Sequence, residues 1–256
     1  AAELMREEFG MGLQGVIATR GRVVSGILNG VDTGLWDPSR EEPGFDRKSI
    51  AGKATARAKL CEEFGLEVPG PLAIVVSRLT DQKGIDLLPQ VIPDFILGGG
   101  GLIVLGSGDP GMEGAMRHLA DRFPGRVAVR IGYDEGLSRR LFAGADAVLV
   151  PSRFEPCGLT QMYGLRYGTL PVVSLVGGLA DTVIGASPAT LAAGVATGVT
   201  FHPVDALAFG QALQKLVELY RQPKLWAKLR ANAMAHPVGW QSSAAAYAGL
   251  YERLTA

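Results

Sequence analysis

The chain has 256 residues, and its 25 lysine and arginine residues match 25 aspartate and glutamate residues, which gives a formal net charge of zero at pH 7. Nucleic acid is therefore not expected as a partner, because binding to a phosphate backbone requires an excess of basic residues. The composition, 47% hydrophobic and 20% charged, is typical of a globular chain, and no apolar stretch approaches the roughly 20 residues that span a bilayer, so a membrane is not expected either.

The first 70 residues give weak signals for secondary structure. A helical stretch is predicted within residues 10–27, a strand leading into a turn at residues 27–32, and a loop at residues 41–44. Stronger patterns begin at residue 72.

Five short apolar runs are predicted to be strands, most of them almost continuously hydrophobic, as in strands buried on both faces of a parallel sheet. They are residues 72–77, 102–105, 127–131, 147–151 and 170–174. Segments of helical length lie between them, at residues 84–97, 111–123, 135–143 and 159–167. This alternation predicts the α/β class, with a Rossmann-like parallel sheet and helices on both of its faces.

Proline affects the first of these helices. Pro89 and Pro93 lie inside residues 84–97, so we expect a kink or a late start, and the glycine run at residues 98–101 should end the helix.

The last third of the chain no longer alternates between strands and helices. Three successive helices are predicted there, at residues 204–220, 223–235 and 241–254.

Residues 106–111 (GSGDPG) spell G-x-G-x-x-G between a predicted strand and a predicted helix, the context of a dinucleotide-binding turn. Such sites also need a carboxylate about 20 residues further on, to hold a ribose. Residues 126–131 contain arginines and no carboxylate. We therefore interpret these glycines as a turn joining strand to helix, and a Rossmann oxidoreductase stays a less favoured alternative.

Three polar loops follow predicted strands and should leave the same edge of the sheet, where ligands bind in open α/β proteins. The first, residues 77–84, carries Arg78 and Lys83. A guanidinium fork and an ammonium point charge suit a diphosphate, although two solvated surface charges would give the same spacing.

The other two loops carry a carboxylate and paired glycines. Glu155 precedes Gly158 at a predicted helix start, where it could bind sugar hydroxyls or stabilise the helix dipole. In residues 176–183, Gly177 and Gly178 allow close approach of the backbone to a ligand, and the polar residues that follow could equally cap a helix. The convergence of three such loops argues for a site more strongly than any one of them.

Neither a metal nor a disulfide framework is expected. The three histidines stand far apart, no D-x-D pair occurs, and Cys61 and Cys157 are the only cysteines, which fits a reducing cytoplasm. Cys157 has no histidine nearby in sequence, so a catalytic thiol is disfavoured. Trp36 is expected to be a packing residue.

Six motifs carry a resemblance that covers nearly the whole chain. They are FGMGLQGVI (9–17), GILNGVDTGLWDP (26–38), SRLTDQKGIDLL (77–88), IGYDE (131–135), PSRFEPCGLTQMYGLRYGTLPVV (151–173) and GGLADTV (177–183). In these motifs the chain resembles the bacterial glycogen synthase and plant starch synthase family. These are retaining glucosyltransferases of the GT-B type, in which two Rossmann-like domains face each other across a cleft.

The resemblance implies a role for each matching position. Arg78 and Lys83 would bind the nucleotide diphosphate and stabilise it as a leaving group, and Glu155 would support the transition state at the donor glucose. The remaining positions would line the donor site, with Tyr133 near the adenine and the others near the sugar and phosphates: Cys157, Gly158, Leu159, Thr160, Gly177 and Gly178. No cofactor and no metal are implied.

The same resemblance implies the donor and the extent of the chain. Related glycosyltransferases usually carry a second glutamate eight positions after the first, where this chain has Tyr163, and the difference favours ADP-glucose as donor. Residues 1–27 resemble the tail of an amino-terminal domain that is not present, residues 28–236 the nucleotide-sugar domain, and residues 237–256 the helix that crosses back. The chain would then be the carboxy-terminal, donor-binding half of the enzyme, inactive alone.

The implied partners are ADP-glucose or ADP, an α-1,4-glucan acceptor and the missing amino-terminal domain. A second class of function stays open beside the enzyme. In that alternative the chain is a module that binds a nucleotide or a glucan without catalysis.

Overall fold

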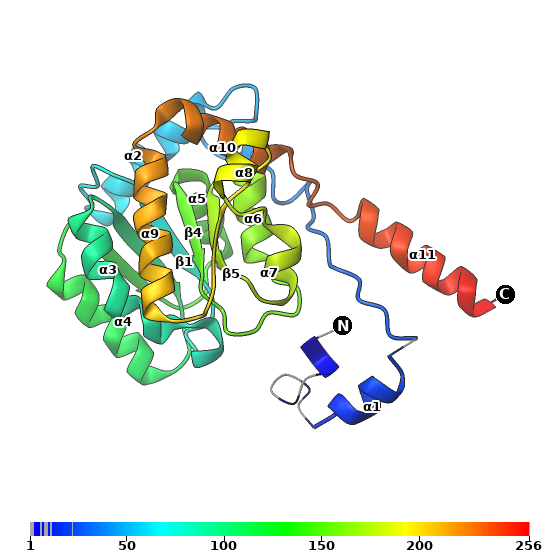
Figure 1. Cartoon of the computed structure of the whole chain (residues 1–256). Coiled ribbons are helices and arrows are strands. Elements are labelled where there is room, and N and C mark those ends of the chain that lie inside the picture. Colours follow the sequence, from blue (N-terminus) through cyan, green and yellow to red (C-terminus); the bar gives the residue numbers. More distant parts are fainter. Residues whose placement is uncertain (1–2, 6, 8–9, 11, 22, 256) are drawn as a thin grey trace. The chain divides into compact units, whose positions relative to one another are not determined.

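The computed structural model describes residues 3–5, 7, 10, 12–21 and 23–255. The chain divides into two units, one formed by residues Val31–Val238 and the other by Ala1–Gly30 with Gly239–Ala256 (Figure 1). No helix in the described ranges is both long and apolar enough to cross a membrane.

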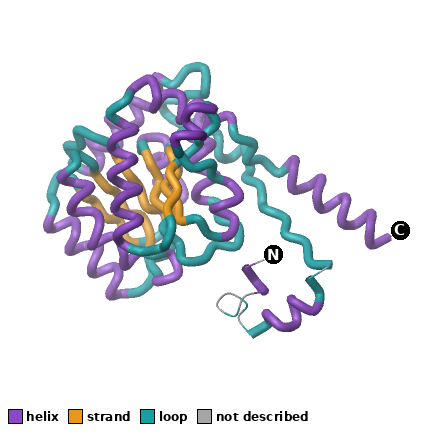
Figure 2. The backbone as a smooth tube through the Cα atoms, viewed as in Figure 1, coloured by secondary structure: helices purple, strands orange, loops and turns teal. Residues whose placement is uncertain are grey.

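The larger unit is built on a six-stranded sheet in which every pair of neighbours is parallel. Figure 2 shows the strands in orange with helices in purple around them. The strand order is β3-β2-β1-β4-β5-β6. The strands are β1 (Leu72–Val76), β2 (Gly101–Gly106), β3 (Val127–Ile131), β4 (Ala147–Val150), β5 (Leu170–Ser174) and β6 (Val199–Phe201). The five predicted strands are confirmed, and β6, only three residues long, is an addition that its short sequence did not signal.

Helices connect the strands and cover the sheet. They are α2 (Ala51–Phe64), α3 (Leu88–Leu97), α4 (Pro110–Arg122), α5 (Glu135–Gly144), α6 (Thr160–Tyr167), α7 (Gly177–Thr182), α8 (Pro188–Ala193), α9 (Ala206–Tyr220) and α10 (Pro223–Ala235). Short 3-10 turns lie at Pro38–Arg40, Asp81–Lys83 and Ile85–Leu87.

The side chains of β1, β2 and β4 alternate between two hydrophobic clusters, one on each face of the sheet. In β1, Ala73 and Val75 pack with buried residues of α3, α4 and α9, whereas Leu72 and Ile74 pack with buried residues of α2 and α5. Because successive side chains of a strand point to opposite faces, a strand covered by helices on both sides must be apolar throughout. The predicted α/β fold with helices on both faces is confirmed.

The late start of α3 is also confirmed. The helix begins at Leu88, so that Pro89 lies in its first turn, where a missing N–H is tolerated, and Pro93 lies inside. The preceding residues form two 3-10 turns joined at Gly84, which has a φ of 66°. A Cβ at Gly84 would lie 2.1 Å from the carbonyl oxygen of Pro151, so only glycine fits.

Three parts of the chain depart from the predictions. Residues 27–30 form no strand, because no neighbouring strand pairs with this glycine-containing segment, although the turn after Asp32 forms, with the amides of Gly34 and Leu35 donating to its carboxylate. Residues 177–182, predicted as a loop, form helix α7. Helix α2 was not predicted, because only Lys53 and two apolar side chains are buried along its 14 residues.

The smaller unit contains α1 (Gln14–Thr19), a 3-10 turn (Glu3–Met5) and α11 (Gln241–Thr255), so the helices predicted within residues 10–27 and at 241–254 are confirmed. Helix α1 has no buried residue, and Ser243 is the buried residue of α11. Large apolar side chains on both helices are exposed, among them Val16, Tyr251 and Leu254. Part of the segment predicted as a domain tail, residues 1–27, lies outside the described residues.

Candidate functional site

The candidate site lies where the carboxyl ends of β1 and β4 meet. These two strands are neighbours at the centre of the sheet, and the chain leaves them in opposite directions, toward β2 on one side and β5 on the other. Ligands of open α/β sheets bind at such a switch point. The loop after β1 carries Arg78 and Lys83, and the loop after β4 carries Glu155.

Lys83 and Glu155 form an ion pair across these two loops. The ammonium group of Lys83 contacts Oε2 of Glu155, and the hydroxyl of Ser152 donates to the same oxygen at 3.3 Å. The side chains are only 18% and 10% exposed. A partly buried carboxylate is thus held opposite a cation that a second anion could also attract.

Arg78 is more exposed and is tied to the same loops through Gln82. Its Nη2 donates to Oε1 of Gln82 at 3.1 Å, and the side-chain amide of Gln82 donates to the backbone carbonyl oxygen of Phe154 at 3.3 Å. The backbone amide of Arg153 in turn donates to the backbone carbonyl oxygen of Gln82 at 2.9 Å. The bridging role of Gln82 has no sequence signal, since a glutamine in a loop is ordinarily solvated.

Arg153, in the loop after β4, also links this loop to the residues that follow β1. Its guanidinium forms a bidentate pair with Asp86, with both N–O distances 2.7 Å, and also donates to the carbonyl oxygen of Asp81. Hydrogen bonds from Arg153 lower the pKa of the Asp86 carboxyl below its ordinary value. Such fork-to-carboxylate pairs fix geometry as well as charge.

A pocket of about 350 Å³ opens beside these loops. Of the predicted site residues it contains Arg78, Tyr133 and Thr160. The rest of the wall comes from Trp36, Val76, Ser77, Leu105, Gly106, Ser107, Gly132, Glu135, Ser138, Phe142 and Tyr163. Its wall therefore combines glycines and hydroxyl groups with aromatic rings, and we call the rings of Trp36, Phe142 and Tyr163 its aromatic wall.

The aromatic wall is ordered by stacking. The ring of Trp36 lies on that of Tyr163, with centroids 3.6 Å apart and planes 13° from parallel, and both contact Phe142 edge-on. Burial raises the pKa of Tyr163. Tyr133 is 83% exposed at the mouth of the pocket. Trp36, expected only to pack, also lines the site, a role that residues more than 100 positions apart could not reveal in sequence.

The other predicted residues form a second group, in the loop before α6 and the start of α7. Leu159 is the N-cap of α6, and Gly158 has a φ of 71°. The amide of Gly178 donates to the carbonyl oxygen of Glu155 at 2.9 Å, and a Cβ at Gly178 would lie 2.4 Å from the carbonyl oxygen of Cys157. Gly178 thus allows close approach of two backbones, and Gly177 beside it has a φ of 41°.

The structure therefore brings the predicted residues together in three adjoining sets. Arg78, Tyr133 and Thr160 share the pocket, Lys83 pairs with Glu155, and the loop 157–159 packs on residues 177–178. The last two sets do not line the pocket itself. They are joined to it through Arg78, Gln82 and the backbone of Phe154.

The GSGDPG segment is a tight turn, as interpreted. A Cβ at Gly106 would lie 1.9 Å from the carbonyl oxygen of Ser77, and one at Gly108 would lie 2.3 Å from that of Leu79. Asp109 then caps α4 by accepting from the amide of Met112 at 3.0 Å. Packing of neighbouring backbones accounts for these glycines without a dinucleotide.

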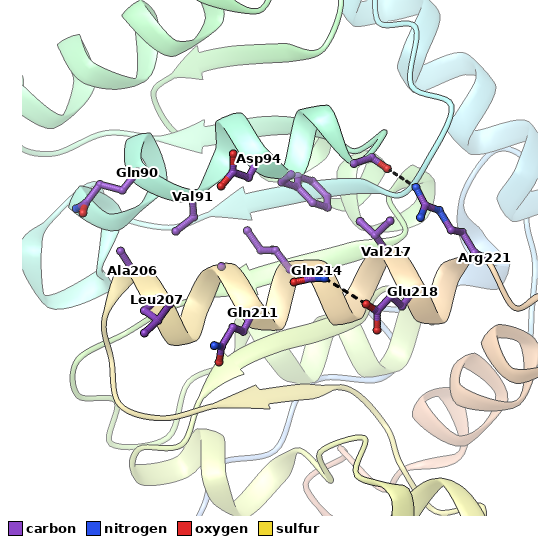
Figure 3. A pocket seen from close by; sticks show the side chains of 14 residues that line it. Gln90, Val91, Asp94, Ala206, Leu207, Gln211, Gln214, Val217, Glu218 and Arg221 are labelled. Atoms are coloured by element: carbon purple, nitrogen blue, oxygen red, sulfur yellow. Dashed lines mark hydrogen bonds between the residues drawn. The ribbon is translucent and has the colours of Figure 1, made fainter.

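A larger hollow, about 490 Å³, lies between α3 and α9 on the outer face of the helical layer (Figure 3). Exposed polar side chains rim it, with Gln214 donating to Glu218 at 3.4 Å and Arg221 to the carbonyl oxygen of Gly98 at 3.1 Å. None of the predicted site residues lines it. Its size alone does not make it the candidate site.

The geometry can be compared with known proteins. The family model described as glycosyl transferases group 1 matches residues 57–235. A glycogen synthase of Cereibacter sphaeroides is 67% identical over 256 residues, which are 100% of this chain and 54% of that protein. A glycogen synthase of Paracoccus denitrificans is 60% identical over 257 residues, covering 100% of this chain and 53% of that protein. The chain spans about half the length of these curated relatives.

Among solved structures, the catalytic domain of starch synthase IV from Arabidopsis thaliana, bound to ADP and acarbose, superimposes with a TM-score of 0.92. It is 33% identical, and the match covers 98% of this chain and 53% of that one. The resemblance to glycogen and starch synthases is confirmed, and so is the fold of one Rossmann-like domain of a GT-B glycosyltransferase. The chain belongs to the glycosyl transferases group 1 family.

Proposed function

We propose that this chain is the donor-binding, carboxy-terminal half of a glycogen synthase, which transfers glucose from ADP-glucose to the non-reducing end of an α-1,4-glucan with retention of configuration. The observation that carries the proposal is the position of the Lys83–Glu155 ion pair and of Arg78 on two adjoining loops at the switch point of the sheet, beside a pocket with an aromatic wall. The identity of 67% to a glycogen synthase supports the reaction, and the similarity to a starch synthase structure bound to ADP supports the nucleotide of the donor.

Arg78 and Lys83 would bind the diphosphate of the donor. Negative charge grows on the diphosphate as the glycosidic bond breaks, so fixed cations beside it stabilise the transition state more than the ground state. Each hydrogen bond of this charged kind contributes about 1.5–3 kcal/mol. Loss of either side chain should therefore slow transfer by tens- to hundreds-fold.

The 350 Å³ pocket would take the nucleoside. Tyr133 at its mouth, with a side chain 83% exposed, offers a ring face to the adenine. Tyr163 stands where a ribose-binding glutamate is usual in related enzymes, and here it supports the aromatic wall. We infer ADP-glucose rather than another sugar nucleotide from this arrangement.

Glu155 would act at the donor glucose. In the structure its carboxylate is paired with Lys83. A bound diphosphate would attract the ammonium group, which leaves the carboxylate oxygens to accept hydrogen bonds from the sugar. The backbone amides of Leu159 and Thr160 at the start of α6 would meet the phosphates, and the loops containing Cys157, Gly158, Gly177 and Gly178 would surround the glucose.

The acceptor glucan would need a second domain. The chain spans about half of its relatives, so we propose that an amino-terminal domain forms the other wall of the cleft. Residues 28–236 would be the donor domain, residues 1–27 the tail of the other domain, and residues 237–256 a helix that crosses back to it. The exposed apolar side chains of α1 and α11 support such a partner. The two cysteines, neither in a disulfide within the described chain, suit the cytoplasm, which we propose as the location.

Calorimetric titration with ADP, run beside a radiolabelled glucose-transfer assay with glycogen as acceptor, tests the proposal. We expect residues 1–256 on their own to bind ADP weakly and to transfer no glucose, because they would form only one wall of the cleft and would neither exclude water nor position the acceptor. Absence of ADP binding would contradict the donor site, and robust transfer by the chain alone would contradict the half-enzyme. ADP binding that never leads to transfer, even with an amino-terminal half added, would favour the non-catalytic binding module.

A further inference from the structure

We propose that Gln161 is a positioning residue that joins the two loops around the donor sugar, an inference that rests on the proposed function. Its side chain is completely buried, at the second residue of α6. The amide nitrogen lies 2.9 Å from the carbonyl oxygen of Cys157, 3.0 Å from that of Gly158 and 3.0 Å from the hydroxyl oxygen of Thr182. One amide group thus contacts the loop before α6 and the end of α7.

Thr182 carries the connection onward. It is the last residue of α7 and is buried, and its hydroxyl donates to the carbonyl oxygen of Gly178 at 2.6 Å. The amide of Gly178 donates to the carbonyl oxygen of Glu155 at 2.9 Å. The hydrogen bonds therefore close a circuit, from the Glu155 loop through Gln161 and Thr182 to the start of α7 and back to Glu155.

The orientation of the Gln161 amide is fixed by its neighbours. With the nitrogen toward Cys157 and Gly158 it faces two carbonyl oxygens, whereas the opposite orientation would place oxygen against oxygen. Its Oε1 is buried and, within the described chain, has no hydrogen-bond partner. Core packing does not account for that oxygen, because a leucine of similar size would avoid the unpaired atom. The hydrogen bonds from its nitrogen to the carbonyl oxygens of Cys157 and Gly158 do account for an amide at this position.

The circuit sets the position of groups proposed to touch the donor. It fixes the backbone on both sides of Gly158, whose φ is 71°, and with it the backbone of Glu155 and the amides that open α6. Binding sites reach full affinity only when their contacting groups are held in place before the ligand arrives. Gln161 and Thr182 would therefore raise donor affinity without touching the donor.

The test compares two threonines whose hydroxyls are both buried. Thr182→Val removes the link, Thr182→Ser retains it, and Gln161→Leu removes the amide. Thr169→Val is the matched control, because the Thr169 hydroxyl donates to the carbonyl oxygen of Phe142 at 2.6 Å and accepts from Lys53 at 2.8 Å, before β5 and away from the site. ADP affinity by calorimetry and unfolding in urea are measured for each variant.

We expect Thr182→Val and Gln161→Leu to weaken ADP binding about tenfold, Thr182→Ser to bind within about twofold of wild type, and Thr169→Val to lose stability while binding ADP normally. If Gln161→Leu does not fold, the threonine comparison decides. Wild-type affinity in Thr182→Val, or an equal loss in Thr169→Val, would overturn the inference. A wild-type chain that does not bind ADP would overturn the proposed function and this inference with it, whereas normal wild-type binding with unaffected variants overturns this inference alone.

Discussion

The ammonium group of Lys83, in the loop after β1, contacts the carboxylate of Glu155, in the loop after β4. The two residues are 72 positions apart, and they meet because β1 and β4 are hydrogen-bonded neighbours in the sheet. Both side chains are largely shielded from water. Each charge therefore offsets part of the cost of burying the other, and the pair stabilises the two loops as well as forming part of the proposed donor site.

A double-mutant cycle measures this coupling. Lys83→Met and Glu155→Gln should each lower the free energy of unfolding by about 1–3 kcal/mol, because the remaining partner is left partly buried without its counter-charge. The double variant should lose less than the sum of the two. Urea unfolding of the four proteins gives the coupling energy. Additive losses would show that the two groups do not stabilise one another in solution.

Substitution of Tyr133 should weaken ADP binding without lowering the stability of the fold. Its side chain is 83% exposed, so Tyr133→Ala should change the free energy of unfolding by less than about 0.5 kcal/mol. Stacking of a base on an aromatic ring contributes about 1–3 kcal/mol, so the affinity for ADP should fall about fivefold or more. Calorimetry with ADP checks the loss. Tyr251→Ala, which removes an exposed ring on α11, is the control and should leave ADP binding unchanged.

The fold was predictable where burial alone decides the pattern. The strands at residues 72–76 and 147–150 are buried on both faces, so their apolar runs could be read without knowledge of their neighbours. Helix α2 could not be predicted in this way. Its buried face is built from Lys53, Ala56 and Leu60, and a lysine usually indicates an exposed face. Helix α7, residues 177–182, was not predicted because its first two residues are glycines, which disfavour a helix.

The candidate site was predictable to the extent that its residues lie in motifs after strands. Arg78, Lys83 and Glu155 were placed correctly at one edge of the sheet, since parallel strands put their following loops together. Trp36 and Gln82 were missed because their roles depend on tertiary partners, Tyr163 for one and Phe154 for the other. Gln161 falls inside a motif, yet the contacts that give it a role reach Thr182 in a different loop.

Lys53 should make stability depend on pH. Its ammonium group is buried against the carbonyl oxygens of Phe142 and Ala143 and the hydroxyl of Thr169, and burial lowers the pKa of Lys53 to about 7. Between pH 7 and the ordinary value of 10.5 the unfolded chain binds a proton that the folded chain lacks. Stability from this group should therefore rise with pH across that window and stay constant below it.

Urea unfolding at several pH values from 6 to 9 checks this dependence against Lys53→Met, in which the titrating group is absent. The difference in unfolding free energy between wild type and variant should change by up to about 1.4 kcal/mol per pH unit above pH 7. A constant difference would mean that Lys53 stays charged in the folded chain, its hydrogen bonds outweighing the cost of burial.

Gly84 and Gly65 distinguish backbone strain from collision. Both have positive φ, 66° and 61°, but a Cβ at Gly84 would lie 2.1 Å from the carbonyl oxygen of Pro151, whereas one at Gly65 would meet nothing within 4 Å. Gly65→Ala should cost about 1–2 kcal/mol, the strain of the left-handed conformation alone. Gly84→Ala should cost more, about 3 kcal/mol or above, because one of two backbones must move. Since Gly84 directly follows Lys83, that movement should also weaken ADP binding, which Gly65→Ala should leave intact. Equal losses of stability in the two variants would mean that the loops after β1 and β4 are packed less closely than the structure indicates.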